Sequence, residues 1–156
     1  MEKSLKCAFT GHRKINITDE LKEQFHLEIL RLIKNGCTEF INGGALGFDM
    51  FAACEIIKLK NYYPVRLKMI LPCKDQAKGW SEYNKMVYEK VISNADDISY
   101  ISEKYEHGCM HKRNRKMVDE CDVLIAFLNK KEGGTYYTVK YAKDNGKMVI
   151  NLGETL

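Results

Sequence analysis

The sequence predicts an α/β fold in which a doubly wound, mostly parallel sheet carries helices on both faces. Two observations support this class: short apolar runs alternate with amphipathic segments of helical length, and no repeat or Pro/Gly-rich linker interrupts them. Strands that alternate with helices in this way form right-handed βαβ crossovers. The chain has 156 residues, 45% of them hydrophobic. This is enough for one core, so residues 1–156 are expected to form a single domain.

The first strand and the first helix have the clearest signals. An apolar run at residues 5–10 ends at Gly11, and Thr18 follows as a candidate N-cap before two acidic residues. Apolar residues then recur every three or four positions up to Gly36, a typical C-terminal cap. We therefore expect an amphipathic helix between Thr18 and Gly36. Its apolar stripe consists of Leu21, Phe25, Ile29 and Leu32.

The remaining elements follow the same alternation. A second strand at residues 38–42 runs into a glycine-rich turn, and a helical stripe continues from there to about residue 60. The third strand, at residues 65–71, is predicted to stop at Pro72, and a third helix covers roughly residues 82–93. The elements expected after these are a strand at 98–102, a helix at 110–120, a strand at 123–128, a helix that follows Gly133 to Thr135 and ends near 145, and a strand at 148–152.

Composition narrows the class of partner. The 25 basic residues exceed the 21 acidic ones by only four, which argues against nucleic acid as a partner and favours a small anionic molecule. The six cysteines form no CxxC pair and indicate a reducing compartment. No signal peptide is recognisable, and no window approaches the roughly 20 apolar residues of a membrane span. We therefore expect a cytoplasmic protein without membrane contact.

Three turns of unusual composition are expected at one edge of the sheet, because every strand-to-helix turn of a parallel sheet lies there. Glycine lets a backbone approach a ligand closely, and a helix N-terminus favours anionic oxygens. Arg13 is a candidate phosphate clamp, and Thr135 either donates to the ligand or caps its helix. The alternative is that the glycines only make tight turns. The candidate ligand-binding residues here are Gly11, His12, Arg13, Gly43, Gly44, Ala45, Gly47, Asp49, Gly133, Gly134 and Thr135.

Asp49 and three further candidates have two interpretations each. Asp49 either interacts with its helix dipole or contacts a ribose hydroxyl. Arg113 and Asn114 fall on or beside the apolar face of their helix, which is unexpected for packing alone, so we expect them at the ligand; the alternative is that they belong to the solvated face of that helix. Trp80 either stacks on a base or covers the core. The neighbouring Lys112, Arg115 and Lys116 are expected to form a solvated basic face.

Catalytic and metal-binding signatures are absent from the sequence. It contains no GxxxxGK[ST], GxSxG or HExxH motif and no strict GxGxxG. The alternating His107, Cys109 and His111 lack a fourth ligand and a recognised zinc spacing. We therefore predict no metal.

Together, these motifs resemble the SLOG superfamily, named for its DprA-like and LOG members, and within it the bacterial YpsA-type proteins. The matching segments lie in order along nearly the whole chain. They are TGHR at residues 10–13, GGALGFD at 43–49, Trp80 and Tyr83, KRN at 112–114, MVDECD at 117–122, GGT at 133–135 and YAK at 141–143. The resemblance implies a Rossmann-like fold with a pocket for a nucleotide or a nucleotide-derived ligand such as NAD, ADP-ribose or AMP. By analogy it favours paired subunits.

The function expected from these observations is binding of such a ligand at the carboxyl edge of the sheet, as a sensor or regulatory module rather than an enzyme. The alternative is a nucleotide hydrolase, because LOG-type members cleave nucleoside monophosphates. Their PGGxGTxxE motif ends in a catalytic glutamate, whereas the matching residue here is Thr138, which cannot act as a general acid or base at neutral pH. Glu132, Asp49 and Asp122 are other carboxylates for that role. A third hypothesis is a protein-interaction regulator with a vestigial pocket.

Overall fold

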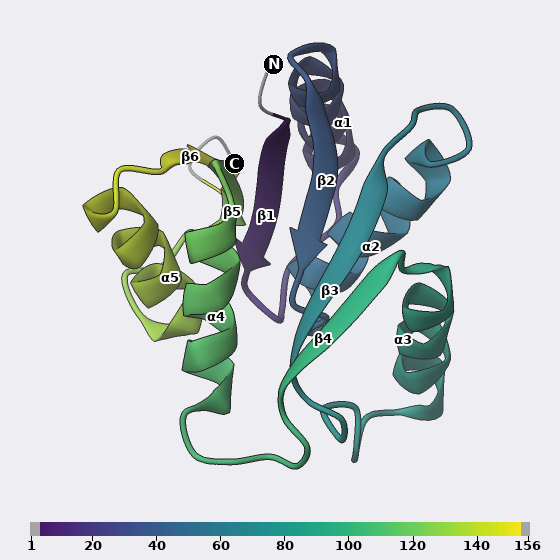
Figure 1. Cartoon of the computed structure of the whole chain (residues 1–156), viewed down its shortest axis with the longest axis vertical. Coiled ribbons are helices and arrows are strands. Elements are labelled where there is room, and N and C mark those ends of the chain that lie inside the picture. Colours follow the sequence, from purple (N-terminus) through teal and green to yellow (C-terminus); the bar gives the residue numbers. More distant parts are fainter. Residues whose placement is uncertain (1–3, 154–156) are drawn as a thin grey trace.

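The computed structural model describes residues 4–153 and shows one six-stranded sheet (Figure 1). The strands are β1 (Leu5–Gly11), β2 (Cys37–Asn42), β3 (Arg66–Cys73), β4 (Asp97–Ser102), β5 (Val123–Phe127) and β6 (Met148–Asn151). Their order in the sheet is β4-β3-β2-β1-β5-β6, and every neighbouring pair is parallel. The predicted α/β class with a parallel sheet is confirmed.

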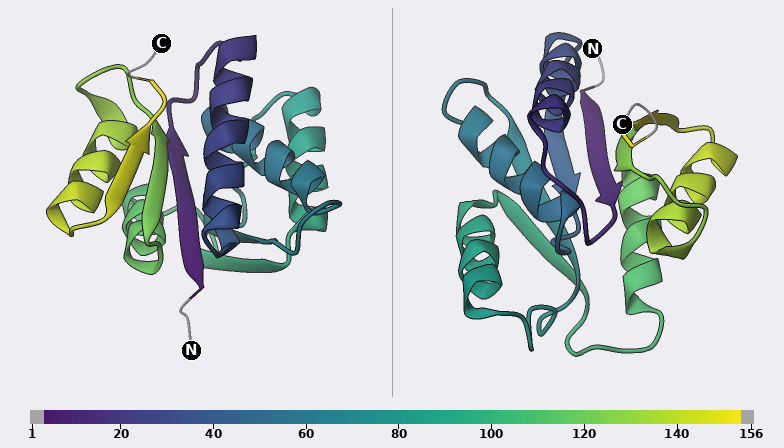
Figure 2. Two further views of the ribbon diagram at one scale, coloured as in Figure 1. Left: turned by 90° about the horizontal axis from the view of Figure 1, so that it is seen from above. Right: turned by 180° about the vertical axis from the view of Figure 1, so that it is seen from behind.

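Five helices cover the two faces of the sheet. They are α1 (Asp19–Lys34), α2 (Phe48–Leu59), α3 (Glu82–Asn94), α4 (Cys109–Glu120) and α5 (Gly133–Asp144). Figure 2 shows α1, α2 and α3 on one face and α4 and α5 on the other. Each layer buries its own apolar cluster, with Phe9, Phe25, Phe40 and Phe48 in the first and Met117, Leu124 and Val139 in the second. The arrangement is the doubly wound one that the alternation of elements predicts.

The strand order reverses beside β1, and this fixes where a ligand site belongs. The chain runs outward from β1 through β2 and β3 to β4, and α4 then returns it to the other side of β1, where β5 and β6 follow. Open α/β sheets bind ligands at the carboxyl ends of the strands where the order reverses. The crevice between the ends of β1 and β5 is therefore the expected site.

The first helix forms as its sequence predicts. The Thr18 hydroxyl accepts a hydrogen bond from the backbone N–H of Leu21 at 3.1 Å, and the acidic residues after Thr18 occupy the first turn. The whole predicted stripe is buried. Phe25 on this stripe packs against Phe9 of β1 and Phe48 of α2, with ring centroids 5.7 and 6.1 Å apart. This aromatic cluster lies under the carboxyl ends of β1 and β2 and fixes the first turn of α2.

Two predicted boundaries are wrong. Strand β3 does not stop at Pro72 but continues to Cys73. Strand β2 pairs with β3 only as far as Met69, and the register with β4 passes from Leu71 to Cys73. Pro72 thus lies on a stretch with a single neighbour, where a missing N–H is tolerated. The second error concerns α5, which begins at Gly133, so the Gly133-Gly134 pair forms its first turn rather than a preceding loop.

The helices between residues 4 and 153 include none that is both long and apolar enough to cross a membrane.

Candidate functional site

A cleft of about 350 Å³ opens at the carboxyl edge of the sheet, where the strand order reverses. Its volume falls within the range of roughly 300–1,000 Å³ found for small-molecule sites. The cleft brings together nine of the residues predicted from sequence: Gly11, His12, Arg13, Ala45, Asp49, Arg113, Asn114, Gly134 and Thr135. Thr10, Met110 and His111 complete its lining. Residues from four separate segments therefore meet in one place.

Thr10, Met110 and His111 are the lining residues that the sequence analysis did not assign to a ligand site, and the last two come from one helix. Both lie in the first turn of α4. Met110 precedes Arg113 by three positions, which places the two on the same side of a helix. The sulfur of Met110 accepts contacts from Nη2 of Arg13 and from Nη2 of Arg113, each at 3.7 Å. The helical spacing from Arg113 is a signal in the sequence from which Met110 could have been identified.

Gly47 joins the first two loops of the cleft. The backbone N–H of Phe48 donates to the carbonyl of His12 at 3.2 Å. Gly47 has a φ of +80°, and a Cβ built on it would lie 2.3 Å from the carbonyl oxygen of Arg13. A side chain at this position is excluded by both conformation and space. The glycine of the GGALGFD turn therefore holds the loop after β1 against the start of α2, rather than contacting a ligand itself.

Arg113 is buried beneath the cleft and ties three segments together. Only 4% of the residue is exposed. Its guanidinium donates to the carbonyl of Gly43, to Oε1 of Gln76 at 3.4 Å and, through Nε, to Oδ1 of Asn114 at 2.7 Å. A Cβ on Gly43 would meet Nη1 at 2.8 Å, so the approach requires glycine. Burial lowers the pKa of Arg113, and the nearby Asp49 opposes that shift.

Asp49 is the carboxylate of the cleft, and it is 4% exposed. Its Oδ2 accepts the backbone N–H of Ala45 at 3.3 Å. Within residues 4–153 its Oδ1 has no hydrogen-bond partner although the atom is buried. Burial raises the pKa of Asp49 from 3.8 to about 6, while the Arg113 charge pulls it down. A buried acceptor of this kind is unusual, and Asp49, which carries it, is part of the lining of the cleft.

Arg13 and His12 lie side by side in sequence but have different roles. Arg13 is exposed at the rim, and in the part of the chain that the structure describes no carboxylate lies within 4 Å of its guanidinium. His12 accepts the backbone N–H of Asn129 through Nε2 at 3.2 Å. Burial, aided by Lys130, lowers the pKa of His12, so the ring is neutral at pH 7. The available cation at the rim is therefore Arg13, while His12 tethers the loop after β5.

The N-terminus of α5 opens into the same cleft. Its N-cap is Glu132, whose side chain makes no capping hydrogen bond. Thr135 is the third residue of the helix, so its interpretation as the cap is wrong. The Thr138 hydroxyl donates to the carbonyl of Gly134 at 2.7 Å. The N–H groups of the first turn have no partner within their own helix, and those of Gly134 and Thr135 lie where an anionic oxygen can accept them.

The structure does not bring Trp80 into the cleft. Its ring packs edge-on against Tyr88 with centroids 5.2 Å apart and contacts the core. Gly43, Gly44, Gly47 and Gly133 shape the neighbouring backbone without lining the cleft. Lys112, Arg115 and Lys116 are exposed, as predicted. Among residues 4–153, no group of three or more His, Cys, Asp or Glu side chains is arranged to hold a metal ion.

Comparison with solved structures identifies two that share the fold. One is DNA processing protein A from Helicobacter pylori, described for its single-stranded DNA binding mode; it has a TM-score of 0.67 and 25% sequence identity. The other is DNA processing protein A (DprA) from Streptococcus pneumoniae, with a TM-score of 0.70 and 16% identity. They match 94% and 95% of this chain, which spans only 64% and 50% of those proteins.

The Helicobacter pylori structure overturns the expectation from composition that argued against nucleic acid as a partner. That protein binds single-stranded DNA. The earlier inference failed because a net charge of +4 describes the whole chain. Phosphate recognition depends instead on local charge, and here Arg13 and Arg113 converge on one cleft although they are far apart in sequence.

Comparison with protein sequences identifies the family. A UPF0398 protein of Bacillus cereus strain B4264 is 30% identical over 132 residues, which cover 82% of this chain and 72% of the relative. A UPF0398 protein of Bacillus thuringiensis strain Al Hakam is 29% identical over the same length. The YpsA family model, described as the YspA SLOG family, matches residues 7–151. The chain therefore belongs to the YspA SLOG family.

Proposed function

We propose that the cleft binds a nucleotide or a nucleotide-derived ligand through its phosphate, and that the protein acts as a binding module. One observation carries the proposal: the uncapped N-terminus of α5 opens onto a cleft that is also lined by the exposed Arg13 and by Asp49, whose buried Oδ1 has no partner within the described residues. Donors that suit an anion and a carboxylate that can accept a hydrogen bond from a hydroxyl thus line one cleft of about 350 Å³. A phosphorylated sugar carries both complementary groups.

Each part of the cleft suits one part of such a ligand. The N–H groups of Gly134 and Thr135 and the guanidinium of Arg13 suit the phosphate oxygens, because helix N-termini and arginine both favour that anion. Oδ1 of Asp49 suits a sugar hydroxyl, which donates the hydrogen bond that this atom lacks. The single-stranded DNA binding of the Helicobacter pylori protein supports the phosphate part of this assignment, since the DNA backbone carries a phosphate at every link, while its sugars have a free hydroxyl only at the strand ends.

A charge placed at Gly134 tests the phosphate position. A Cβ there meets only the Nδ2 atom of Asn114, at 4.0 Å, so small substitutions fit without strain. Gly134→Asp puts a carboxylate where the phosphate is expected, and Gly134→Ala is the matched neutral control. Thermal shift measurements with AMP, ADP-ribose and NAD should show at least one ligand that stabilises the wild type and Gly134→Ala but not Gly134→Asp. Stabilisation of all three proteins alike, or of none, would contradict the proposal.

A second candidate function is hydrolysis of the N-glycosidic bond, favoured by the burial and raised pKa of Asp49. A carboxyl group that titrates near neutral pH suits a general base. Ionised Asp49 would take a proton from water as the water oxygen bonds to C1′ of the sugar; the C1′–N bond breaks, and the proton passes to the departing base. Chromatography of the ligand after incubation separates the functions. Free base from the wild type but not from Asp49→Asn establishes hydrolysis, and intact ligand establishes binding alone.

A further inference from the structure

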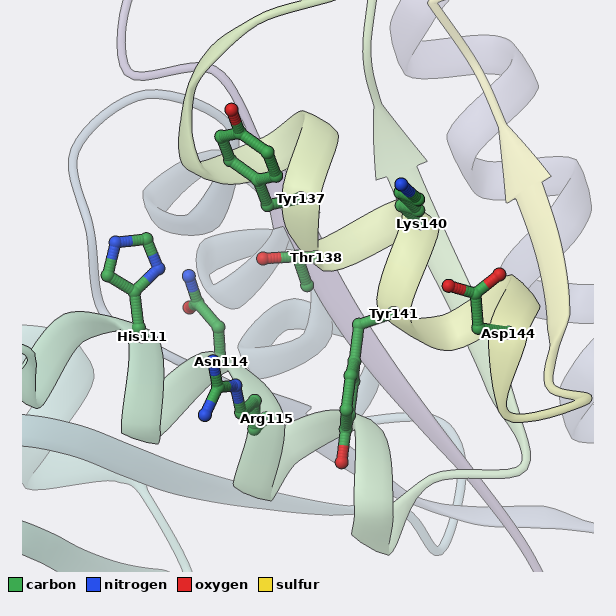
Figure 3. Close-up of a pocket in the computed structure, with 8 residues that line it drawn as sticks. All are labelled: His111, Asn114, Arg115, Tyr137, Thr138, Lys140, Tyr141 and Asp144. Carbon is green, nitrogen blue, oxygen red and sulfur yellow. The ribbon is translucent and has the colours of Figure 1, made fainter.

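A second hollow adjoins the cleft between α4 and α5. Figure 3 shows His111, Asn114 and Arg115 along α4, facing Tyr137, Thr138 and Tyr141 of α5 across it. Its volume is about 210 Å³, below the roughly 300–1,000 Å³ typical of a complete small-molecule site. It is therefore more suited to part of a larger ligand than to a separate molecule. We call it the α4–α5 groove.

The groove and the cleft are continuous. His111 and Asn114 line both. Oδ1 of Asn114 accepts the Nε–H of Arg113 at 2.7 Å, which turns its Nδ2 donor toward Gly134 at the start of α5. An amide donor thus lies at the junction of the two hollows, beside the helix N-terminus assigned to the phosphate. A ligand whose phosphate lies at that junction can extend into the cleft or into the α4–α5 groove.

The walls of the groove combine positive charge with an exposed aromatic ring. Arg115 and Lys140 lie on opposite helices, and both are exposed. Tyr137 is 60% exposed, and its ring is held edge-on to Tyr136 with centroids 5.6 Å apart. The Tyr141 hydroxyl donates to Asp119 at 2.7 Å, and Asp144 lies at the far end. Basic side chains beside an available aromatic face are the features that hold the backbone and bases of single-stranded nucleic acid.

We infer that the α4–α5 groove holds the adjoining nucleotide of a single-stranded nucleic acid whose first nucleotide occupies the cleft. The inference rests on the proposed function, because the cleft supplies the first nucleotide. The linking phosphate lies at Asn114 and the N-terminus of α5, the next base stacks on Tyr137, and Arg115 faces the following phosphate. Thr138, which replaces the glutamate of LOG-type members, is buried in the wall and bonded within its own helix, so the groove carries no carboxylate at that position.

Binding of thymidine monophosphate and of oligothymidylates of increasing length tests the inference. The wild type should bind an oligothymidylate more tightly than the monophosphate. Tyr137→Ala should weaken oligonucleotide binding by about 5-fold or more, the loss expected for one base–aromatic stack, while leaving the affinity for the monophosphate unchanged. Tyr137→Phe keeps the ring and should bind as the wild type does. Circular dichroism and melting curves confirm that each variant is folded.

Salt dependence tests the charge on α4. Arg115→Ala should reduce the slope of log K against log salt by about 0.7, the value for one phosphate contact on a single strand. Lys116→Ala removes an exposed charge from the same helix outside the groove and should leave the slope unchanged. If the two variants behave alike, or if oligothymidylates bind no tighter than the monophosphate, the inference is wrong while the proposed function stands. The inference is also wrong, and the proposed function stands, if Tyr137→Ala weakens the binding of ADP-ribose or NAD but not of the oligothymidylates. If no oligothymidylate binds the wild type, the inference fails, and the proposed function fails with it only if AMP, ADP-ribose and NAD also fail to bind.

Discussion

Replacing Asp49 by asparagine should make the protein more stable at neutral pH. Burial raises the pKa of Asp49 from 3.8 to about 6, so the folded protein binds this proton more tightly than the unfolded chain does. Stability from this group is then fully present below pH 3.8 and is lost as pH rises through about 6. The difference between the two pKa values corresponds to about 3 kcal/mol. Asparagine has the same shape and does not ionise.

Urea unfolding of the wild type and Asp49→Asn across pH 4 to 8 measures this effect. The gain in unfolding free energy should be small at the acid end, increase toward pH 6 and level off at up to about 3 kcal/mol. His12 contributes a slope of opposite sign, since its pKa is lowered, but it is present in both proteins and cancels in the difference. A gain independent of pH, or a less stable variant at pH 7, would refute the reasoning. A less stable variant would mean that the carboxylate is a net favourable partner of Arg113.

Two further substitutions test the framework around the cleft, and thiol labelling tests the burial of the cysteines. Gly47→Ala should destabilise the protein by about 3 kcal/mol or more in urea unfolding. Its φ of +80° is unfavourable for alanine, and the added Cβ would lie 2.3 Å from the carbonyl oxygen of Arg13. Gly36→Ala, with φ +97° but open space, should lose only about 1–2 kcal/mol. Arg113→Ala should lose about 3 kcal/mol or more by leaving the Gly43 carbonyl unpaired and Asp49 without its cation, whereas Lys112→Ala on the exposed face of α4 should stay within about 0.5 kcal/mol. A thiol reagent should react slowly with the native protein but should label all six cysteines in guanidinium. The reason is burial, which shields the thiols and, for Cys37, raises the pKa to about 12.

Elements with a strong local signal were predictable from the sequence. The Thr18 cap and the stripe that follows it define α1 within a residue or two, because the periodicity of an amphipathic helix and its cap are both local properties. Pro72 was misjudged for the opposite reason. Whether a proline is tolerated in a strand depends on which neighbour pairs with it, and the end of β2 at Asn42 determines that.

The location of the cleft could be predicted from the sequence, but the contacts of its side chains could not. Parallel topology brings the turns after β1, β2 and β5 to one edge, so glycine-rich turns in the sequence located the site. The direction of each side chain was not accessible in the same way. Arg113 and Asn114 were both expected at the ligand, yet Arg113 is committed to Gly43, Gln76 and Asn114 beneath the cleft, and this is visible only when residues from three segments meet. Trp80 turned toward Tyr88 for a similar reason, because α3 offers it an apolar neighbour.

The placement of charge around Asp49 favours a ligand over a purely structural role. Arg113 donates hydrogen bonds to the neutral oxygens of Gly43, Gln76 and Asn114 rather than to Asp49, although the two charges interact and Arg113 lowers the pKa of Asp49. A structural ion pair would normally be closed by direct hydrogen bonds, since burial of both charges is otherwise unfavourable. Here Oδ1 of Asp49 stays buried and unpartnered within the described chain. A donor from a bound sugar would complete this acceptor, lower the pKa of Asp49 and restore the stability that its burial removes, so ligand affinity should decrease as pH falls below about 6.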